Sequence, residues 1–350
     1  MDKQIKNYGF IDEKVRDEDY KFGAESPLGS HPVLLESTDW TDYLPTDELQ
    51  RDENGGEDSM ACTNFSFQND VESIFELYIK NGMLHIEDYK WLKEKGYFDE
   101  NGKIKFNNRF NAKMSGTTRR GNSMRNPVDS ARKDGLIPWS VWKYEPFYNN
   151  QPFVWEDYYQ KPPQEAIDLG KEFLKRFKIN YETVWTNTKD LKEARKYSPV
   201  HTAVHAWPYP VNDVYPRTAG SFNHAIINHA NEWDILDHYK INGTFIKKLA
   251  PDFIFLSYGF VYFITTLINP LTFTKIMKLK NNHLYQEVEQ SGSFGVAVDD
   301  KLIVGDTASI LATFIMRNNG DINGKCVAVK KEDWDSVNHY NPGLELQKEE

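Results

Sequence analysis

Apolar side chains change their spacing part-way along this chain, and that change limits how it can fold. Up to about residue 195 they recur at helical intervals in four segments: 62–82, 86–96, 123–135 and 162–177. From 196 to 269, short runs rich in Val, Ile, Phe and Tyr predict strands separated by turn residues: 199–207, 222–228, 232–237 and 260–267. Helices followed by strands predict an α+β protein whose N-terminal helical half packs on a C-terminal antiparallel β half.

The two ends of the chain differ from this body. Residues 1–38 are polar with no sustained period, and they predict an extended arm. Residues 270–350 predict a small α/β extension: a hairpin that turns at Asp299 and Asp300, a helix over 307–318 capped by Thr307, and a strand around Val327.

Charge and cysteine content exclude several classes of protein. The net charge of −10, with no Lys/Arg-rich block, argues against a nucleic-acid partner. Two cysteines, Cys62 and Cys326, cannot build a disulfide framework or a thiolate zinc site. The first residues lack the apolar stretch of a secretory signal, and the most apolar segment, 253–268, is too short and too interrupted to span a membrane. We therefore expect a protein made in the cytoplasm without a signal peptide and without a membrane partner.

Cys62 stands just ahead of the first helical segment. The amide N–H groups and the positive end of a helix dipole favour a thiolate there by about 0.3–2 kcal/mol, which would lower the pKa of the thiol. Ser59 or Asp58 could cap the same turn. A single cysteine before a helix is more often a small structural residue, so this position alone leaves both roles open.

A nucleophilic thiol also needs a base and a group that orients the base. His224 lies in the strand-like run "FNHAIIN", and Asp237 closes the next run thirteen residues later, a distance typical of a hairpin. Four other histidines are rivals for the role of base: His201, His205, His229 and His238.

The order of these elements resembles that of the papain-like cysteine peptidases over roughly residues 39–265. The segments that carry the resemblance are "DWTDYL" (39–44), "ACTNFSFQNDVE" (61–72), "SGTTRRGN" (115–122), "ARKDGLIPWSVWKY" (131–144), "SPVHTAVHAW" (198–207), "AGSFNHAIINHANEWDILDHY" (219–239) and "LSYGFVYFI" (256–264). The resemblance implies a papain-like domain over 39–269, with its helical half ending near 195.

The resemblance also implies roles for particular residues. Cys62 falls on the nucleophile, His224 on the base and Asp237 on the orienting amide. Gly121 falls near the wall glycine whose backbone pairs with the substrate, with Asn122 and Asn223 as further substrate contacts. The N–H of Cys62 would supply one oxyanion donor.

The sequence departs from the family pattern at the second oxyanion donor. The family has a glutamine six residues before the cysteine, where this chain has Gly56. Gln50, if residues 51–58 loop out, and Asn54 are the two candidates to replace it. In addition, the orienting residue is Asp237 instead of asparagine, and Tyr239 replaces the tryptophan that shields it.

The function implied is a cysteine peptidase or amide hydrolase with a polypeptide substrate and no metal or organic cofactor. The amino-acid sequences of residues 115–142 and of the C-terminal extension also resemble those of bacteriophage- and prokaryote-encoded papain-like proteins. That likeness implies a virion-associated protein that binds a virion partner through residues 270–350, an attachment module. Two alternatives stay open: a catalytically weak or inactive structural protein of a virus particle, and a cysteine hydrolase that cleaves peptidoglycan.

Overall fold

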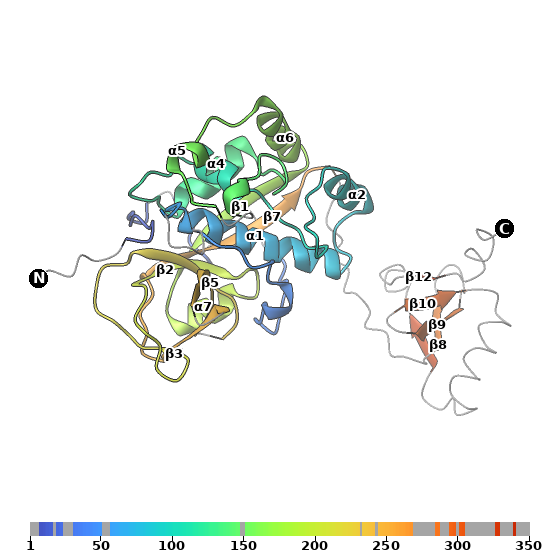
Figure 1. Cartoon of the computed structure of the whole chain (residues 1–350). Helices are drawn as coiled ribbons and strands as arrows, with labels where there is room; N and C mark the ends of the chain where they lie inside the picture. Colours follow the sequence, from blue (N-terminus) through green and yellow to red (C-terminus); the bar gives the residue numbers. More distant parts are fainter. Residues whose placement is uncertain are drawn as a thin grey trace, which may run out of the picture. The chain divides into compact units, whose positions relative to one another are not determined.

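The computed structural model describes residues 7–16, 19–23, 31–50, 57–147, 151–231, 233–241 and 244–268, together with the backbone of five strands beyond residue 283. The chain divides into two compact units, Met1–Leu271 and Thr272–Glu350 (Figure 1). Among the described residues, every helix is too short or too polar to cross a bilayer.

The first unit is a mixed α+β structure, as expected from the change of period. Its helices are α1 (Cys62–Lys80), α2 (Ile86–Glu94), α3 (Asn108–Met114), α4 (Arg125–Asp134), α5 (Trp155–Tyr158), α6 (Gln164–Leu174) and α7 (Thr188–Ala194), with short 3-10 turns at Thr41–Tyr43 and Glu145–Phe147. Its strands are β1 (Phe177–Trp185), β2 (Val200–Val204), β3 (Val214–Tyr215), β4 (His224–Asn228), β5 (Asp234–Ile241), β6 (Thr244–Leu249) and β7 (Tyr258–Thr266).

The seven strands form one sheet in the order β1-β7-β2-β4-β5-β6-β3. All neighbours are antiparallel except β3 and β6, which pair in parallel through Val214 and Tyr215. The sequence analysis missed β1, which lies within the expected helical half and pairs along its whole length with β7. The sharp division between a helical half and a strand half was therefore wrong at this strand.

Helix α1 is the central element of this unit. It runs between helices α4, α5 and α6 on one side and strands β2 and β5 on the other (Figure 1), and every residue from Cys62 to Tyr78 is buried. The sequence pattern predicted one apolar face, but polar residues of α1 such as Asp70 and Glu72 are enclosed as well. The main core contains many aromatic side chains of α1 and its neighbours, among them Phe75, which makes edge-to-face contacts with Phe106 and Phe177.

The second unit contains a sheet in the order β11-β8-β9-β10-β12. Its strands are β8 (Leu284–Glu287), β9 (Phe294–Val298), β10 (Lys301–Val304), β11 (Cys326–Val329) and β12 (His339–Tyr340). The antiparallel pairing of β9 and β10 agrees with the predicted hairpin, and β11 agrees with the strand expected around Val327. The helix predicted over 307–318 lies outside the described residues.

Candidate active site

Cys62 is the first residue of α1, as the sequence predicted. Its neighbour Ala61 is the N-cap and makes no side-chain capping bond. The prediction that Ser59 or Asp58 caps this helix was wrong, because both side chains bond elsewhere: Ser59 Oγ donates to the carbonyl of Gln50, and an Asp58 oxygen accepts from Met60 N–H.

The sulfur of Cys62 lies against the start of strand β4. Ala225 N–H donates to Sγ at 3.4 Å, and Ala225 directly follows His224. His224 is fully buried, and its Nδ1 has no hydrogen-bond partner among the described groups. The fold thus brings the sulfur of Cys62 against the backbone of strand β4 at the residue that follows His224.

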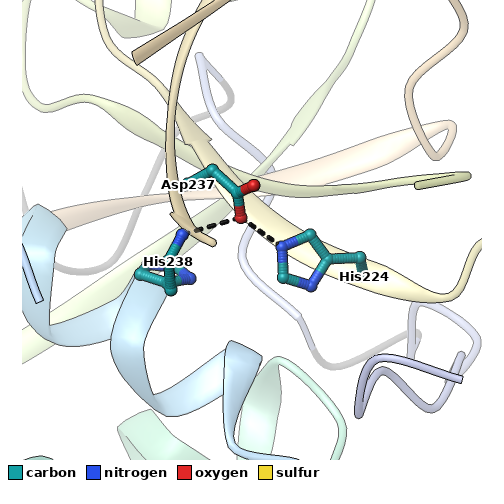
Figure 2. Close-up of side chains that lie close together, drawn as sticks. All are labelled: His224, Asp237 and His238. Atoms are coloured by element: carbon teal, nitrogen blue, oxygen red, sulfur yellow. Dashed lines mark hydrogen bonds and ion pairs between the residues drawn. The ribbon is translucent and has the colours of Figure 1, made fainter. Parts of the chain in front are cut away.

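The other nitrogen of His224 bonds to Asp237 on the neighbouring strand β5. Nε2 and Asp237 Oδ1 lie 2.5 Å apart, and the same oxygen accepts from His238 N–H at 2.7 Å (Figure 2). The second carboxylate oxygen pairs with the ammonium of Lys247 at 2.6 Å. Burial alone would raise the pKa of Asp237, but the charges of Lys247 and His224 outweigh it and hold that pKa well below its usual range.

The side chain of Gln50 binds the N-terminal arm and Asp58. Its Nε2 donates to the carbonyl of Tyr8 at 2.9 Å and to Asp58 Oδ1 at 2.8 Å. The other Asp58 oxygen accepts from the hydroxyl of Tyr239. Gln50 is therefore held with one N–H directed at a peptide carbonyl. Its rival Asn54 lies outside the described residues.

The N-terminal arm lies across these groups, and it supplies that carbonyl. Tyr8 N–H donates to the carbonyl of Asn223 at 3.1 Å, and the Tyr8 ring lies 5.5 Å from the His224 ring. The expected substrate-wall residues pair with the same arm: Asn122 N–H donates to Gly9 O at 2.9 Å, and Ile11 N–H donates to Asn122 O at 2.8 Å, in a parallel arrangement.

Two glycines allow the arm to approach so closely. Gly121 has a φ of +101°, and a Cβ there would lie 2.0 Å from Gly9 O. Gly9 has a φ of +103°, and a Cβ there would lie 2.4 Å from the carbonyl oxygen of Met60, two residues before Cys62. Any side chain at either position would collide with backbone.

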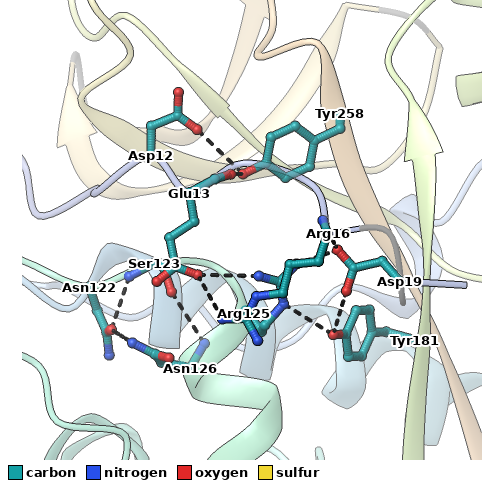
Figure 3. Close-up of polar contacts among 10 residues, drawn as sticks. All are labelled: Asp12, Glu13, Arg16, Asp19, Asn122, Ser123, Arg125, Asn126, Tyr181 and Tyr258. Atoms are coloured by element: carbon teal, nitrogen blue, oxygen red, sulfur yellow. Dashed lines mark hydrogen bonds and ion pairs between the residues drawn. The ribbon is translucent and has the colours of Figure 1, made fainter.

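A buried polar network fixes the arm further along (Figure 3). The guanidinium of Arg125, at the start of α4, pairs with Asp19 and with Glu13 of the arm. Tyr258 donates to the carbonyl of Glu13, and Tyr181 lies between Arg125 and Asp19. The polar arm predicted from the sequence is extended, and it is also docked.

Burial determines the state of the thiol. Cys62 is 0% exposed, and burial raises the pKa of its thiol, with the nearby Asp58 and Asp237 charges adding to the effect. Hydrogen bonds from the N–H groups of Ala225 and Thr63 lower the pKa but do not compensate. The expected lowering of the Cys62 pKa by the helix N-terminus was wrong for the buried thiol, because the effect of desolvation on this pKa exceeds the effect of the helix dipole.

The rival histidines lie in other surroundings. His201 is buried in the core with Nδ1 at 2.7 Å from the hydroxyl of Tyr262, and burial lowers its pKa to about 3. His205 pairs with Thr218, and burial lowers the pKa of His229 to about 4. Only His238 adjoins the site, with its ring 6.1 Å from that of His224.

The site also contains side chains of the types that bind metal ions. Among the described residues, one group of potential ligands has its donor atoms within 4.8 Å of one another: His224, Asp237 and His238. Both oxygens of Asp237 are already bonded, one of them to an ammonium. A cation would have to displace Lys247, so the arrangement favours orientation of His224 over metal binding.

Two parts of the site were missed by sequence reasoning. Lys247 pairs with Asp237. The one sequence feature that indicates this lysine is the alternation in "TFIKKL", which places it on the same strand face as Phe245 and Leu249. The backbone contacts of Tyr8 with Asn223 and of Gly9 with Asn122 join residues more than a hundred positions apart, and no local pattern indicates them. The side chain of Asn223, predicted to bind substrate, is bonded to Ala206, while its carbonyl faces the arm.

Comparisons with known proteins give only distant structural similarities. No protein-family model and no curated protein matches the sequence. Among solved structures, the chain is similar to xylellain, a cysteine protease from Xylella fastidiosa, at 14% identity and a TM-score of 0.46, over 75% of this chain and 97% of that one. It is also similar to the ragweed cysteine protease Amb a 11 in its proform, at 13% identity and a TM-score of 0.43, over 69% and 68%. A third similar structure is the stem bromelain precursor, at 14% identity and a TM-score of 0.40, over 72% and 78%. All three scores lie below 0.5, so the chemistry of the site is judged on its own residues.

Proposed function

We propose that this chain is a papain-like cysteine peptidase or amide hydrolase that cleaves polypeptides through Cys62, His224 and Asp237. Three observations support it: the imidazole of His224 is oriented by a carboxylate, the Cys62 sulfur accepts from the N–H of the next residue, Ala225, and a Gln50 N–H is directed at a peptide carbonyl. These are the parts that acyl transfer to a thiol requires.

In this reaction the imidazole Nδ1 of His224 takes the proton of the Cys62 thiol, and the sulfur attacks the carbonyl carbon of the substrate. The new oxyanion is held by the amide of Gln50 and the N–H of Cys62. As the C–N bond breaks, the imidazolium gives its proton to the departing amine. Water, deprotonated by His224, then hydrolyses the thioester and regenerates the thiol. Asp237 orients the ring throughout.

In the closed state the arm excludes substrate from these groups. Tyr8 and Gly9 hold the backbone positions that a substrate would need, at Asn223, Asn122 and Gln50. Catalysis therefore requires the arm to leave. The same proposal includes an attachment role for residues 270–350, in which they bind a virion partner.

A structural protein that retains the fold is a second candidate, because Cys62 is completely enclosed and burial raises the pKa of its thiol. The bacteriophage origin and the peptidoglycan substrate remain predictions from the sequence.

The experiment is covalent labelling of the full chain with a peptidyl epoxide that reacts with activated thiols. Wild type and Cys326→Ala should each take up one label, and Cys62→Ala should take up none. In a second assay, wild type and Cys326→Ala should release new amino termini from denatured casein, and Cys62→Ala should not. Absence of labelling, also after the arm has been displaced, would favour the structural candidate.

A further inference from the structure

Strand β6 carries a lysine on its inward face. The strand alternates exposed and buried residues, and Lys247 shares the buried positions with Phe245 and Leu249. Its side chain is fully enclosed. Lysine is almost never fully buried unless it is paired, so its surroundings have to explain its presence.

The ammonium of Lys247 is bound on several sides. It lies 2.6 Å from Asp237 Oδ2 and donates to the carbonyl of Tyr239 at 2.7 Å. It also stands over the rings of Trp207 and Tyr215, at 5.3 and 5.9 Å from their centroids. Since Asp237 Oδ1 bonds to His224 Nε2, the three side chains form one row: ammonium, carboxylate and imidazole.

The other titratable groups facing His224 are neutral. Burial lowers the pKa of His238 to about 3 and raises that of Tyr239 well above its ordinary value. The Tyr8 ring of the arm lies 5.5 Å from the His224 ring, Cys62 of α1 accepts from the N–H of the adjacent Ala225, and Asp58 is bonded to the hydroxyl of Tyr239. Asp237 and Lys247 are therefore the charges closest to the imidazole.

A lone buried carboxylate would bind imidazolium tightly and resist the release of its proton, because opposite charges attract strongly away from water. We propose that Lys247 is a positioning residue that neutralises Asp237, so that the pair orients His224 by hydrogen bonding without adding net charge beside it. This role presupposes the thiol–imidazole chemistry proposed above.

The test is a double-mutant cycle of Lys247→Met and Asp237→Asn in the full chain. Both changes are made in a Cys326→Ala, Gly9→Ala background, in which Cys62 is the one thiol and the arm is displaced. The readout is the pH profile of Cys62 alkylation by iodoacetamide, whose upper limb reports loss of the imidazolium proton from the thiolate–imidazolium pair.

We expect Lys247→Met to move the upper limb to higher pH by about one unit or more, since the carboxylate is then uncompensated. Asp237→Asn alone should move it lower, because the ammonium is left beside the ring. The double variant has neither charge and should return to within about 0.3 units of the parent. If Lys247→Met does not fold, the pH profile of the double variant is compared with that of the parent. This comparison still tests the role of Lys247, because the double variant buries no unpaired charge.

An unchanged profile in Lys247→Met, or a double variant that stays shifted like Asp237→Asn, would overturn this role and leave the proposed function intact. A parent whose alkylation follows a simple free-thiol titration would instead count against the proposed function itself.

Discussion

Replacing Gly9 by alanine should release the arm from Cys62. The residue has a φ of +103°, and an added Cβ would lie 2.4 Å from the oxygen, 2.6 Å from the carbon and 2.8 Å from the Cα of Met60. Because all three atoms are backbone at the entry to α1, none can rotate away. The arm has to lift, and the hydrogen bonds between its residues 8–11 and Asn122, Asn223 and Gln50 weaken together.

The size of the effect follows from the backbone and the clash. A non-glycine residue in this region of φ costs about 1–3 kcal/mol, and the overlap with Met60 adds to that cost. Since about 1.4 kcal/mol is a factor of ten in an equilibrium, the fraction of molecules with an open site should rise at least about tenfold. If alkylation proceeds through opening, its rate rises by the same factor.

The arm contains a matched control. Gly23 also has a positive φ, +76°, but a Cβ there meets nothing within 4 Å. Gly23→Ala therefore bears a backbone cost without the collision. In a Cys326→Ala background, alkylation of Cys62 by iodoacetamide should be at least about tenfold faster in Gly9→Ala than in the parent. It should also be faster in Gly9→Ala than in Gly23→Ala, because only Gly9→Ala adds the collision. Equal rates in the two variants would refute the occlusion of Cys62 by the arm.

Two further predictions concern the body. Gln50→Ala in the Gly9→Ala background should lower kcat for a peptide amide by about 100- to 1000-fold, because one oxyanion donor is lost; an unchanged kcat would remove Gln50 from the site. Burial raises the pKa of Asp70 well above its ordinary value, so its folded form keeps a proton that the unfolded chain releases above about pH 4. Stability contributed by this proton is present at low pH and lost as pH rises. Asp70→Asn should therefore gain stability over wild type as pH rises above about 4, by at most about 1.4 kcal/mol per pH unit, as measured by denaturant unfolding; a constant difference would contradict the burial argument.

The local elements of the site could be predicted because their signals are local. The helix expected to begin at Cys62 and end near Gly82 is α1, Cys62–Lys80. His224 and Asp237 were expected on consecutive strands, and they lie on β4 and β5. Periodicity and hairpin spacing contain this information, because both act over a few residues.

What the sequence could not predict depends on contacts between distant segments. The strand β1 is held by β7, about eighty residues later, and its sequence follows directly on a helical pattern. Neither Gln50 nor Asn54 stands six residues before Cys62, and the use of Gln50 depended on whether residues 51–58 loop out. The pKa of Cys62 depends on its burial by distant segments, which no local pattern indicates, so the helix dipole alone predicted the wrong direction for that pKa.

The pairing of Cys62 with His224 can be tested by one pH profile. In the Gly9→Ala, Cys326→Ala background, alkylation of Cys62 by iodoacetamide should stay fast down to about pH 6, because the imidazolium stabilises the thiolate. Adding His224→Ala should restrict fast alkylation to pH values near and above about 8.5, the range of an ordinary thiol. If both proteins give the same profile, His224 does not act on the sulfur and the proposed hydrolase mechanism fails.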